Sequence, residues 1–174
     1  MTESTHPRRD VLRFAATFLA LVLALRWVVT LGPIAWFVHE PLCLAIARVS
    51  GWMLTPFGMV VVQGNRLAFD GFWVQVVEAC NGVLPTTIYL SAVFAFPATW
   101  SARLWGAAIG IPAIFGLNLL RVASLVVLGA TWPSLFEDVH IYVWQTLVVA
   151  LSMGVWIFWA ERFVRPTARV EASA

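Results

Sequence analysis

Four long apolar segments constrain the fold of this chain more than any other feature of its sequence. A helix that crosses a bilayer needs roughly 20 apolar residues. The segments that meet this length are residues 11–31, 82–100, 104–129 and 141–160. Only 11% of the 174 residues are charged, whereas about a quarter are charged in an ordinary soluble domain. The sequence therefore predicts an all-α polytopic membrane protein, with a four-helix transmembrane bundle in a single domain over residues 1–174.

A further apolar stretch, residues 41–54, is too short for a span and contains Arg48. His39 and Glu40 directly precede it. We expect this stretch to form a helix that lies at the membrane interface. It belongs to the long connection between the first two spans, residues 32–81.

The second half of this connection has the pattern of short strands. Three runs are rich in β-branched and aromatic residues, namely residues 59–63, 66–69 and 72–77. The dipeptides between them are Gly64-Asn65 and Asp70-Gly71, and both are typical of two-residue hairpin turns. The pattern predicts a small β-hairpin or meander.

Arginine supplies every basic side chain, and its distribution predicts the orientation of the chain. With four spans, one side of the membrane carries seven arginines: Arg8, Arg9, Arg13, Arg103, Arg162, Arg165 and Arg169. Because such an excess marks the cytoplasmic side, we expect cytoplasmic tails at residues 1–10 and 161–174 and an extracytoplasmic segment at residues 32–81. The N-terminus resembles a signal peptide, but residues 11–31 are long enough to span and no small-residue cleavage site follows. We therefore expect a retained first helix.

Several classes of site have no support in the sequence. The three His and two Cys are scattered without the spacing of metal ligands, and no glycine pattern of a nucleotide-binding loop is present. No basic stripe is dense enough to follow a nucleic-acid backbone. We expect neither a metal nor another cofactor, and no nucleic-acid partner.

Three chemically distinctive residues converge at one depth in the predicted topology. Cys80 lies just before the second span and His140 just before the fourth, and both of those helices begin on the outer side. Arg121 lies in the third span, which begins near Leu104 on the inner side. A rise of ~1.5 Å per residue carries Arg121 about 25 Å across a core of about 30 Å. All three side chains are therefore expected near the extracytoplasmic face.

The sequence around Cys80 favours a reactive thiol. Pro85 is tolerated only in the opening turn of a helix, so the second span is expected to begin around residues 81–84 with Asn81 as N-cap. Cys80 would then lie at the positive end of the helix dipole, where the nucleophilic thiolate is favoured. Glu78, beside it, is a plausible partner for Arg121 or His140.

His140 and Arg121 also have the chemical properties of active-site residues. We expect His140 in a first helical turn, capped by Asp138, where a neutral imidazole that acts as general base is favoured. An ionisable side chain inside a membrane helix is costly and usually functional. Arg121 is such a residue, and it would hold a substrate carbonyl or stabilise an oxyanion. Asn118 shares its helical face and would orient it or join it.

Each of these residues also has an ordinary structural interpretation. A lone Cys at a helix start is more often a small buried hydrophobe than a nucleophile, and a disulfide between Cys43 and Cys80 is an alternative on the oxidising side of the membrane. Cys43 itself has the surroundings of a packing residue. His140 is explained as an interface residue. Arg121 is explained as one half of a structural ion pair with Glu78, Glu137 or Asp138.

Taken together, these residues resemble a known family. The sequence Val-Glu-Ala-Cys80-Asn-Gly, then Asn118-Leu-Leu-Arg121-Val in the next span, then His140 at the start of the last, is similar to the exosortase/archaeosortase family, and within it to exosortase H. The resemblance covers about residues 41–159. Many exosortases have Cys-Ser-Gly where this chain has Cys80-Asn-Gly. This chain therefore keeps the nucleophile, but it has an amide where those exosortases have a serine hydroxyl.

The resemblance implies a protein-sorting cysteine protease or transpeptidase in the bacterial inner membrane, with its active site facing the periplasm. Its substrates would be secreted proteins with a C-terminal sorting tail, which consists of a short motif, an apolar helix and a basic cluster. Cys80 would form an acyl-enzyme with the substrate, Arg121 would bind the carbonyl oxygen and His140 would shuttle the proton. The sorting motif and the acceptor, water or an amine, stay open.

A second interpretation does not involve catalysis. The chain would then be a membrane subunit for assembly or export in a surface-polysaccharide system, with an inert Cys80 and an ion-paired Arg121. A transporter is a poorer fit, because the sequence has no paired broken helices and no polar cluster at the midplane.

Overall fold

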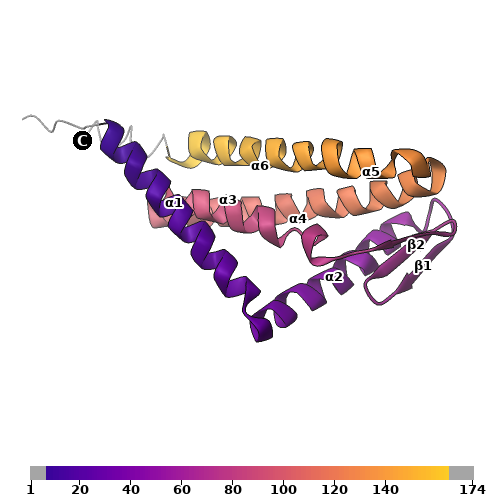
Figure 1. The fold of residues 1–174 in the computed structure, drawn as a ribbon. Helices are drawn as coiled ribbons and strands as arrows, with labels where there is room; N and C mark the ends of the chain where they lie inside the picture. The colour runs from indigo at the N-terminus through magenta and orange to yellow at the C-terminus, as the bar shows by residue number, and fades with distance from the viewer. Residues whose placement is uncertain (1–6, 165–174) are drawn as a thin grey trace, which may run out of the picture.

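The computed structural model describes residues 7–164, which form long helices with one small sheet at one end (Figure 1). The helices that precede the last one in the chain are α1 (Pro7–Thr30), α2 (Gly32–Leu54), α3 (Val83–Ala95) and α4 (Trp100–Thr131). A 3₁₀ turn, η1 (Glu78–Cys80), precedes α3. The strands are β1 (Val60–Gln63), β2 (Arg66–Phe69) and β3 (Phe72–Gln75).

The last helix is continuous over Pro133–Val164 but changes its winding along the way. Its parts are the 3₁₀ turn η2 (Pro133–Leu135), α5 (Phe136–Asp138), the π-helical η3 (Val139–Trp144), α6 (Gln145–Trp159) and the π-helical η4 (Ala160–Val164). It therefore begins well before residue 141, where the sequence predicts the start of the span.

Within residues 7–164, three helices are long and apolar enough to cross a membrane: Arg8–Thr30, Trp100–Thr131 and Pro133–Val164. The chain is thus a multi-pass membrane protein. The predicted span at residues 82–100 is shorter than expected, because α3 has only 13 residues, or about 20 Å. It ends where Phe96 turns to an extended conformation, at φ −71° and ψ 138°, since a residue that precedes a proline is disfavoured in the α region.

The expected interfacial helix is present, but it begins earlier than residue 41. Leu31 is extended, with φ −63° and ψ 127°, and a proline occupies the first turn of α2, where it costs no hydrogen bond. Pro41 lies inside the helix and not at its start. The extended Leu31 separates α1 from α2, and the two helices form an open V in Figure 1.

Glycines on α4 let the neighbouring helices approach closely. A Cβ at Gly110 would overlap the ring of Tyr89 from α3, and the Tyr89 hydroxyl donates a hydrogen bond to the carbonyl of Gly106 at 3.0 Å. From α6, the indole N–H of Trp159 donates to the carbonyl of Ala102 at 2.6 Å. Small residues at such crossings are typical of membrane helix packing. They hold α3 and α6 against α4.

The sheet is an antiparallel meander in the order β1-β2-β3. Asp70 and Gly71 both have positive φ, 47° and 89°, as a type I′ turn requires. In the first turn only Gly64 does, at 60°. The predicted three-stranded meander is therefore confirmed, with strand ends within two residues of those expected.

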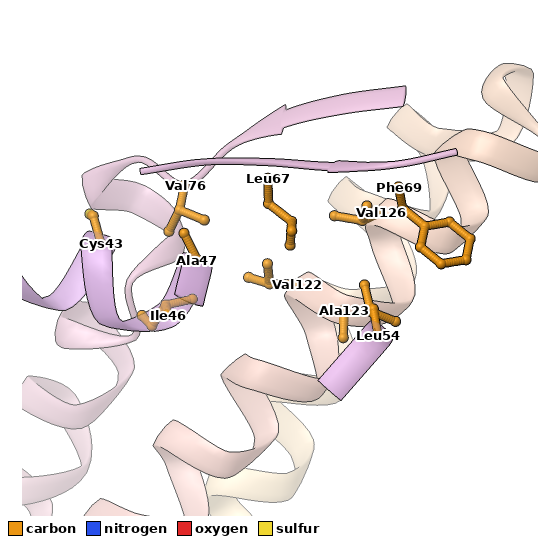
Figure 2. Packing of buried hydrophobic residues seen from close by; sticks show 10 residues of the cluster. All are labelled: Cys43, Ile46, Ala47, Leu54, Leu67, Phe69, Val76, Val122, Ala123 and Val126. Atoms are coloured by element: carbon orange, nitrogen blue, oxygen red, sulfur yellow. The ribbon is translucent and has the colours of Figure 1, made fainter. Parts of the chain in front are cut away.

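The sheet is fixed to α2 and α4 by one apolar cluster, drawn in Figure 2. Leu67 and Val76 point from the sheet side into the space between the two helices, and both are almost fully buried. The other members of the cluster are Cys43, Ile46, Ala47, Leu54, Phe69, Val122, Ala123 and Val126. Gly129 extends this contact, because a Cβ there would overlap the ring of Phe72. The chain that leaves β3 is thereby held beside the C-terminal third of α4.

Candidate functional site

Cys80 is the last residue of η1, and its backbone is held on both sides. Its N–H donates to the carbonyl of Val77 at 2.8 Å. Its carbonyl accepts a hydrogen bond from the side-chain amide of Asn118 at 2.7 Å. Asn118 is buried in α4, so it cannot move away without losing a buried hydrogen bond. The sequence predicts that Asn118 orients or joins Arg121, but in the structure its side-chain amide holds the Cys80 backbone instead.

The Cys80 side chain faces His140. The distance from Sγ to Nε2 is 3.6 Å, which is within the range of a hydrogen bond that involves sulfur. His140 does not lie in a first helical turn, because the helix begins at Pro133, and Asp138 makes no capping hydrogen bond. It lies instead in the π-helical η3, a rare geometry that is frequent at functional sites. The ring of Phe136, centred 5.8 Å from the His140 ring, packs beside it.

Arg121 is buried and unpaired. Its side chain is only 8% exposed, and its Nε has no hydrogen-bond partner. Within residues 7–164, the Arg121 guanidinium forms no ion pair, so the predicted structural pairs with Glu78, Glu137 or Asp138 are absent. An unpaired buried cation is costly, and this cost is relieved if an anionic or polar ligand binds.

These side chains meet in a pocket of about 310 Å³, to which Cys80, Arg121, His140 and Glu137 all contribute. The remaining wall comes from β3 and the chain that follows it, from Val122 and Leu125 of α4, and from Phe136. A second cavity, of about 360 Å³, lies along α1, α3 and α6 and is almost entirely apolar. Arg121 lines both cavities. The predicted convergence of thiol, guanidinium and imidazole thus occurs in the structure.

A comparison with protein families assigns the chain. The model of the transmembrane exosortase family matches residues 9–159. The chain belongs to the transmembrane exosortase family. Among curated proteins and among solved structures, none matches the chain. The family match agrees with the resemblance in the sequence around Cys80, Arg121 and His140, while the exosortase H branch stays a prediction.

In this exosortase a buried polar network supports the Cys80 turn from α2. The side-chain oxygen of Asn81 accepts a hydrogen bond from the N–H of Val83 at 3.0 Å. Its amide nitrogen therefore faces Nδ1 of His39, at 2.6 Å, and donates to it. Nε2 of His39 lies 3.2 Å from a carboxylate oxygen of Glu78, although outside the angle of a hydrogen bond. His39 thus contacts residues on both sides of Cys80.

This network changes two expectations. The sequence predicts Glu78 as a partner of Arg121 or His140, but in the structure Glu78 lies beside His39. The N-cap of α3 is Gly82, with φ 80°, and not Asn81 as predicted. Asn81 still caps the helix from the position before Gly82, because its side chain accepts the hydrogen bond of the Val83 N–H. His39 is missing from the predicted site. His39 lies on the buried face of α2, at helical spacing before Cys43, Ile46, Ala47 and Ser50. A buried imidazole needs a polar partner, so this spacing in the sequence could have indicated a polar contact for His39.

Cys43 is the second thiol of the exosortase. Both cysteines are free, so the possible Cys43–Cys80 disulfide is not formed in this structure. Cys43 is 4% exposed, and burial raises the pKa of its thiol. It therefore acts as a small packing residue, as the sequence indicates. In the described part of the chain, no group of three or more His, Cys, Asp or Glu lies close enough to hold a metal ion.

Proposed function

We propose that this exosortase is a cysteine-type peptidase or transpeptidase that cleaves exported proteins through an acyl-enzyme on Cys80. The observation that carries the proposal is the 3.6 Å approach of the Cys80 sulfur to Nε2 of His140 in a pocket that also holds the unpaired Arg121. A thiol beside an imidazole is the usual arrangement of a cysteine nucleophile and its base.

The first half of the reaction transfers the acyl group to sulfur. Nε2 of His140 takes the proton of the Cys80 thiol, and the thiolate attacks the scissile carbonyl carbon. The carbonyl oxygen gains negative charge and is stabilised by the Arg121 guanidinium. When the C–N bond breaks, the leaving amine takes the proton from His140, and a thioester remains on Cys80.

The second half releases the acyl group. Water or an acceptor amine attacks the thioester carbonyl while His140 takes the proton of the nucleophile. Arg121 stabilises the oxyanion again, and the Cys80 sulfur leaves and recovers its proton from His140. The network of Asn118 and Asn81 holds the Cys80 backbone in place during both halves.

The apolar cavity supports a substrate with a C-terminal sorting tail. Its walls come mainly from the helices α1, α3 and α6, with Ala79 and Arg121 at its edge, and the residues that these three helices contribute are Phe14, Phe18, Leu84, Pro85, Ile88, Tyr89, Ala92, Gln145, Val148, Val149, Ser152, Met153 and Trp156. Side chains of an apolar substrate helix fit such a groove. Because Arg121 also lines it, a helix in the groove leads its extracytoplasmic end to Cys80.

The same proposal includes the orientation in the membrane. The start of α1 and the end of the last helix lie at one end of the bundle, and the sheet lies at the other (Figure 1). Among the described residues, the arginines in the segments at the first end favour the cytoplasm for it, namely Arg8, Arg9, Arg13, Arg103 and Arg162, while Arg165 and Arg169 lie outside the described residues. The bundle would then have α3 as its fourth, shortened membrane helix and the Cys80 pocket at the periplasmic face.

The proposal is tested with Cys80→Ala in cells that export a reporter fused to a sorting tail, taken from a co-encoded protein that ends in an apolar helix and a basic cluster. Uncleaved reporter should accumulate while the variant stays at the normal level in the membrane. The matched control is Cys43→Ala, which should still cleave. Cleavage by Cys80→Ala would contradict the proposal and would favour the non-catalytic assembly subunit.

A further inference from the structure

Strand β3 has a free edge. In the sheet order β1-β2-β3, only one side of β3 is paired by the residues that the structure describes. Phe72 pairs with Phe69 across the two-residue turn, and further along, the N–H of Val76 donates to the carbonyl of Asn65 at 2.9 Å. Because hydrogen-bonded and non-bonded pairs alternate in an antiparallel ladder, the N–H and C=O groups of Trp73 and Gln75 point away from β2.

This free edge faces the pocket of Cys80. The pocket is lined by every residue from Phe72 to Val77 in succession. Side chains of a strand alternate between its two faces, so a cavity that touches all of them lies against the edge. The opposite wall carries Phe136, Glu137 and His140 from the last helix.

The edge also leads directly to the nucleophile. Only Val76 and Val77 separate β3 from η1, whose last residue is Cys80. Free strand edges present rows of unpaired donors and acceptors that pair readily with another extended chain. The edge of β1 is equally free, but it does not line this pocket.

We propose that the substrate segment before the scissile bond binds as an extended strand along β3, hydrogen-bonded to the backbones of Trp73 and Gln75. The inference rests on the proposed function, because that function places the scissile carbonyl at Cys80. The bound segment runs in the same direction as β3, since its C-terminal side continues past Cys80 to the apolar groove. Main-chain pairing supplies affinity, while alternate side chains of the substrate supply selectivity.

The experiment measures the alkylation of Cys80 in the full-length exosortase, purified in detergent. The probe is the tripeptide reagent acetyl-Ala-Ala-Ala chloromethyl ketone, in which the Cys80 sulfur displaces chloride, and iodoacetamide is the small reference reagent. The tripeptide reagent should show saturation, because it binds the edge before it reacts. N-methylation of its amides should raise the half-saturating concentration about tenfold, as expected for one or two lost hydrogen bonds.

Variants of the protein separate the backbone from the side chain. Gln75→Pro removes one outward N–H without breaking the β2 ladder and should raise the half-saturating concentration by a similar factor, with the iodoacetamide rate unchanged. Gln75→Ala loses the same side chain but keeps that N–H, so its half-saturating concentration should be clearly lower than that of Gln75→Pro. The matched control is Val62→Pro, which removes an outward N–H from the free edge of β1 and should have no effect on saturation.

The possible failures are distinct. Absence of saturation, or no effect of N-methylation and of Gln75→Pro, would overturn the inference even if Cys80 reacts readily with iodoacetamide. A change of oligomeric state in Gln75→Pro would also overturn it, because the edge would then pair with a second copy. A Cys80 that reacts with iodoacetamide no faster than free cysteine would contradict the proposed function itself.

Discussion

The two cavities that meet at Arg121 differ in what surrounds them. The Cys80 pocket is lined by a strand, a 3₁₀ turn, the irregular start of the last helix and part of α4, and it gathers a thiol, an imidazole, a guanidinium and a carboxylate. The groove is built by the regular helices α1, α3 and α6, and its walls are almost entirely apolar. The thiol and the imidazole thus come from irregular backbone and the guanidinium comes from the regular helix α4, while the groove offers a largely apolar surface.

Arg121 can serve both cavities because its side chain has two characters. Its methylene stem is compatible with apolar neighbours, while the guanidinium at its tip needs polar partners. Nε is buried without a partner. The comparison therefore predicts that changes at Arg121 affect chemistry, that changes in the groove affect substrate binding, and that changes behind Cys80 affect its position.

The largest effect is expected from Arg121→Ala. Loss of the group that stabilises the oxyanion should lower kcat/KM for reporter cleavage by about 10²- to 10³-fold. Arg121→Lys keeps the charge but loses the planar fork of donors, so its activity should be intermediate. The control is the level of the variant in the membrane, which reports an intact fold independently of the Cys80 chemistry. Normal cleavage by Arg121→Ala would show that this arginine is structural.

A smaller effect is expected where the groove is filled. Val149, which is 56% exposed, lines the groove on α6, whereas Leu151, 47% exposed on the same helix, does not. Overpacking typically costs 1–3 kcal/mol, so Val149→Trp should raise KM about tenfold, while Leu151→Trp leaves it unchanged. If the two variants had the same KM, the groove would not be part of the substrate-binding site.

The sequence predicts best those features that short local signals determine. The strands follow from Gly64-Asn65 and Asp70-Gly71, because these dipeptides adopt positive φ at little cost. The common depth of Cys80, Arg121 and His140 is predicted from the order of the spans and the rise of a helix, but the 3.6 Å approach of Cys80 to His140 is seen only in the structure. The class of the protein follows from the scarcity of charge.

Other features depend on tertiary contacts that periodicity does not contain. The last helix continues upstream to Pro133 because its first turns pack beside β3, where the rings of Phe72 and Phe136 lie 5.4 Å apart. The partner of Glu78 is His39, which is distant in sequence. The early end of α3, in contrast, has a local cause that the sequence contains. Pro97 disfavours a helical conformation of Phe96, but the apolar residues continue past it, so the predicted span is too long.

A moderate effect on Cys80 is expected from changes of His39. His39→Asn places an oxygen where Nδ1 accepts the hydrogen bond of Asn81, whereas His39→Gln places its polar atoms nearer Nε2. One such hydrogen bond contributes about 0.5–1.5 kcal/mol. His39→Gln should therefore slow both Cys80 alkylation and kcat about two- to tenfold without a change in KM, and His39→Asn should restore both. Equal losses in the two variants would indicate a general packing role.

The smallest effect concerns the second thiol and tests whether the reactive chemistry is confined to one region. Because burial raises the pKa of Cys43, its thiol stays protonated at neutral pH, and the thiolate forms only as the pH rises above the ordinary range of thiols. Alkylation requires the thiolate, so iodoacetamide at pH 7 should label Cys80 before Cys43, as read from mass spectra of their peptides. After unfolding in detergent the two rates should converge, because only the folded protein buries Cys43 against Ala47 and Val76. Equal labelling in the folded state would mean that the Cys80 pocket confers no special reactivity.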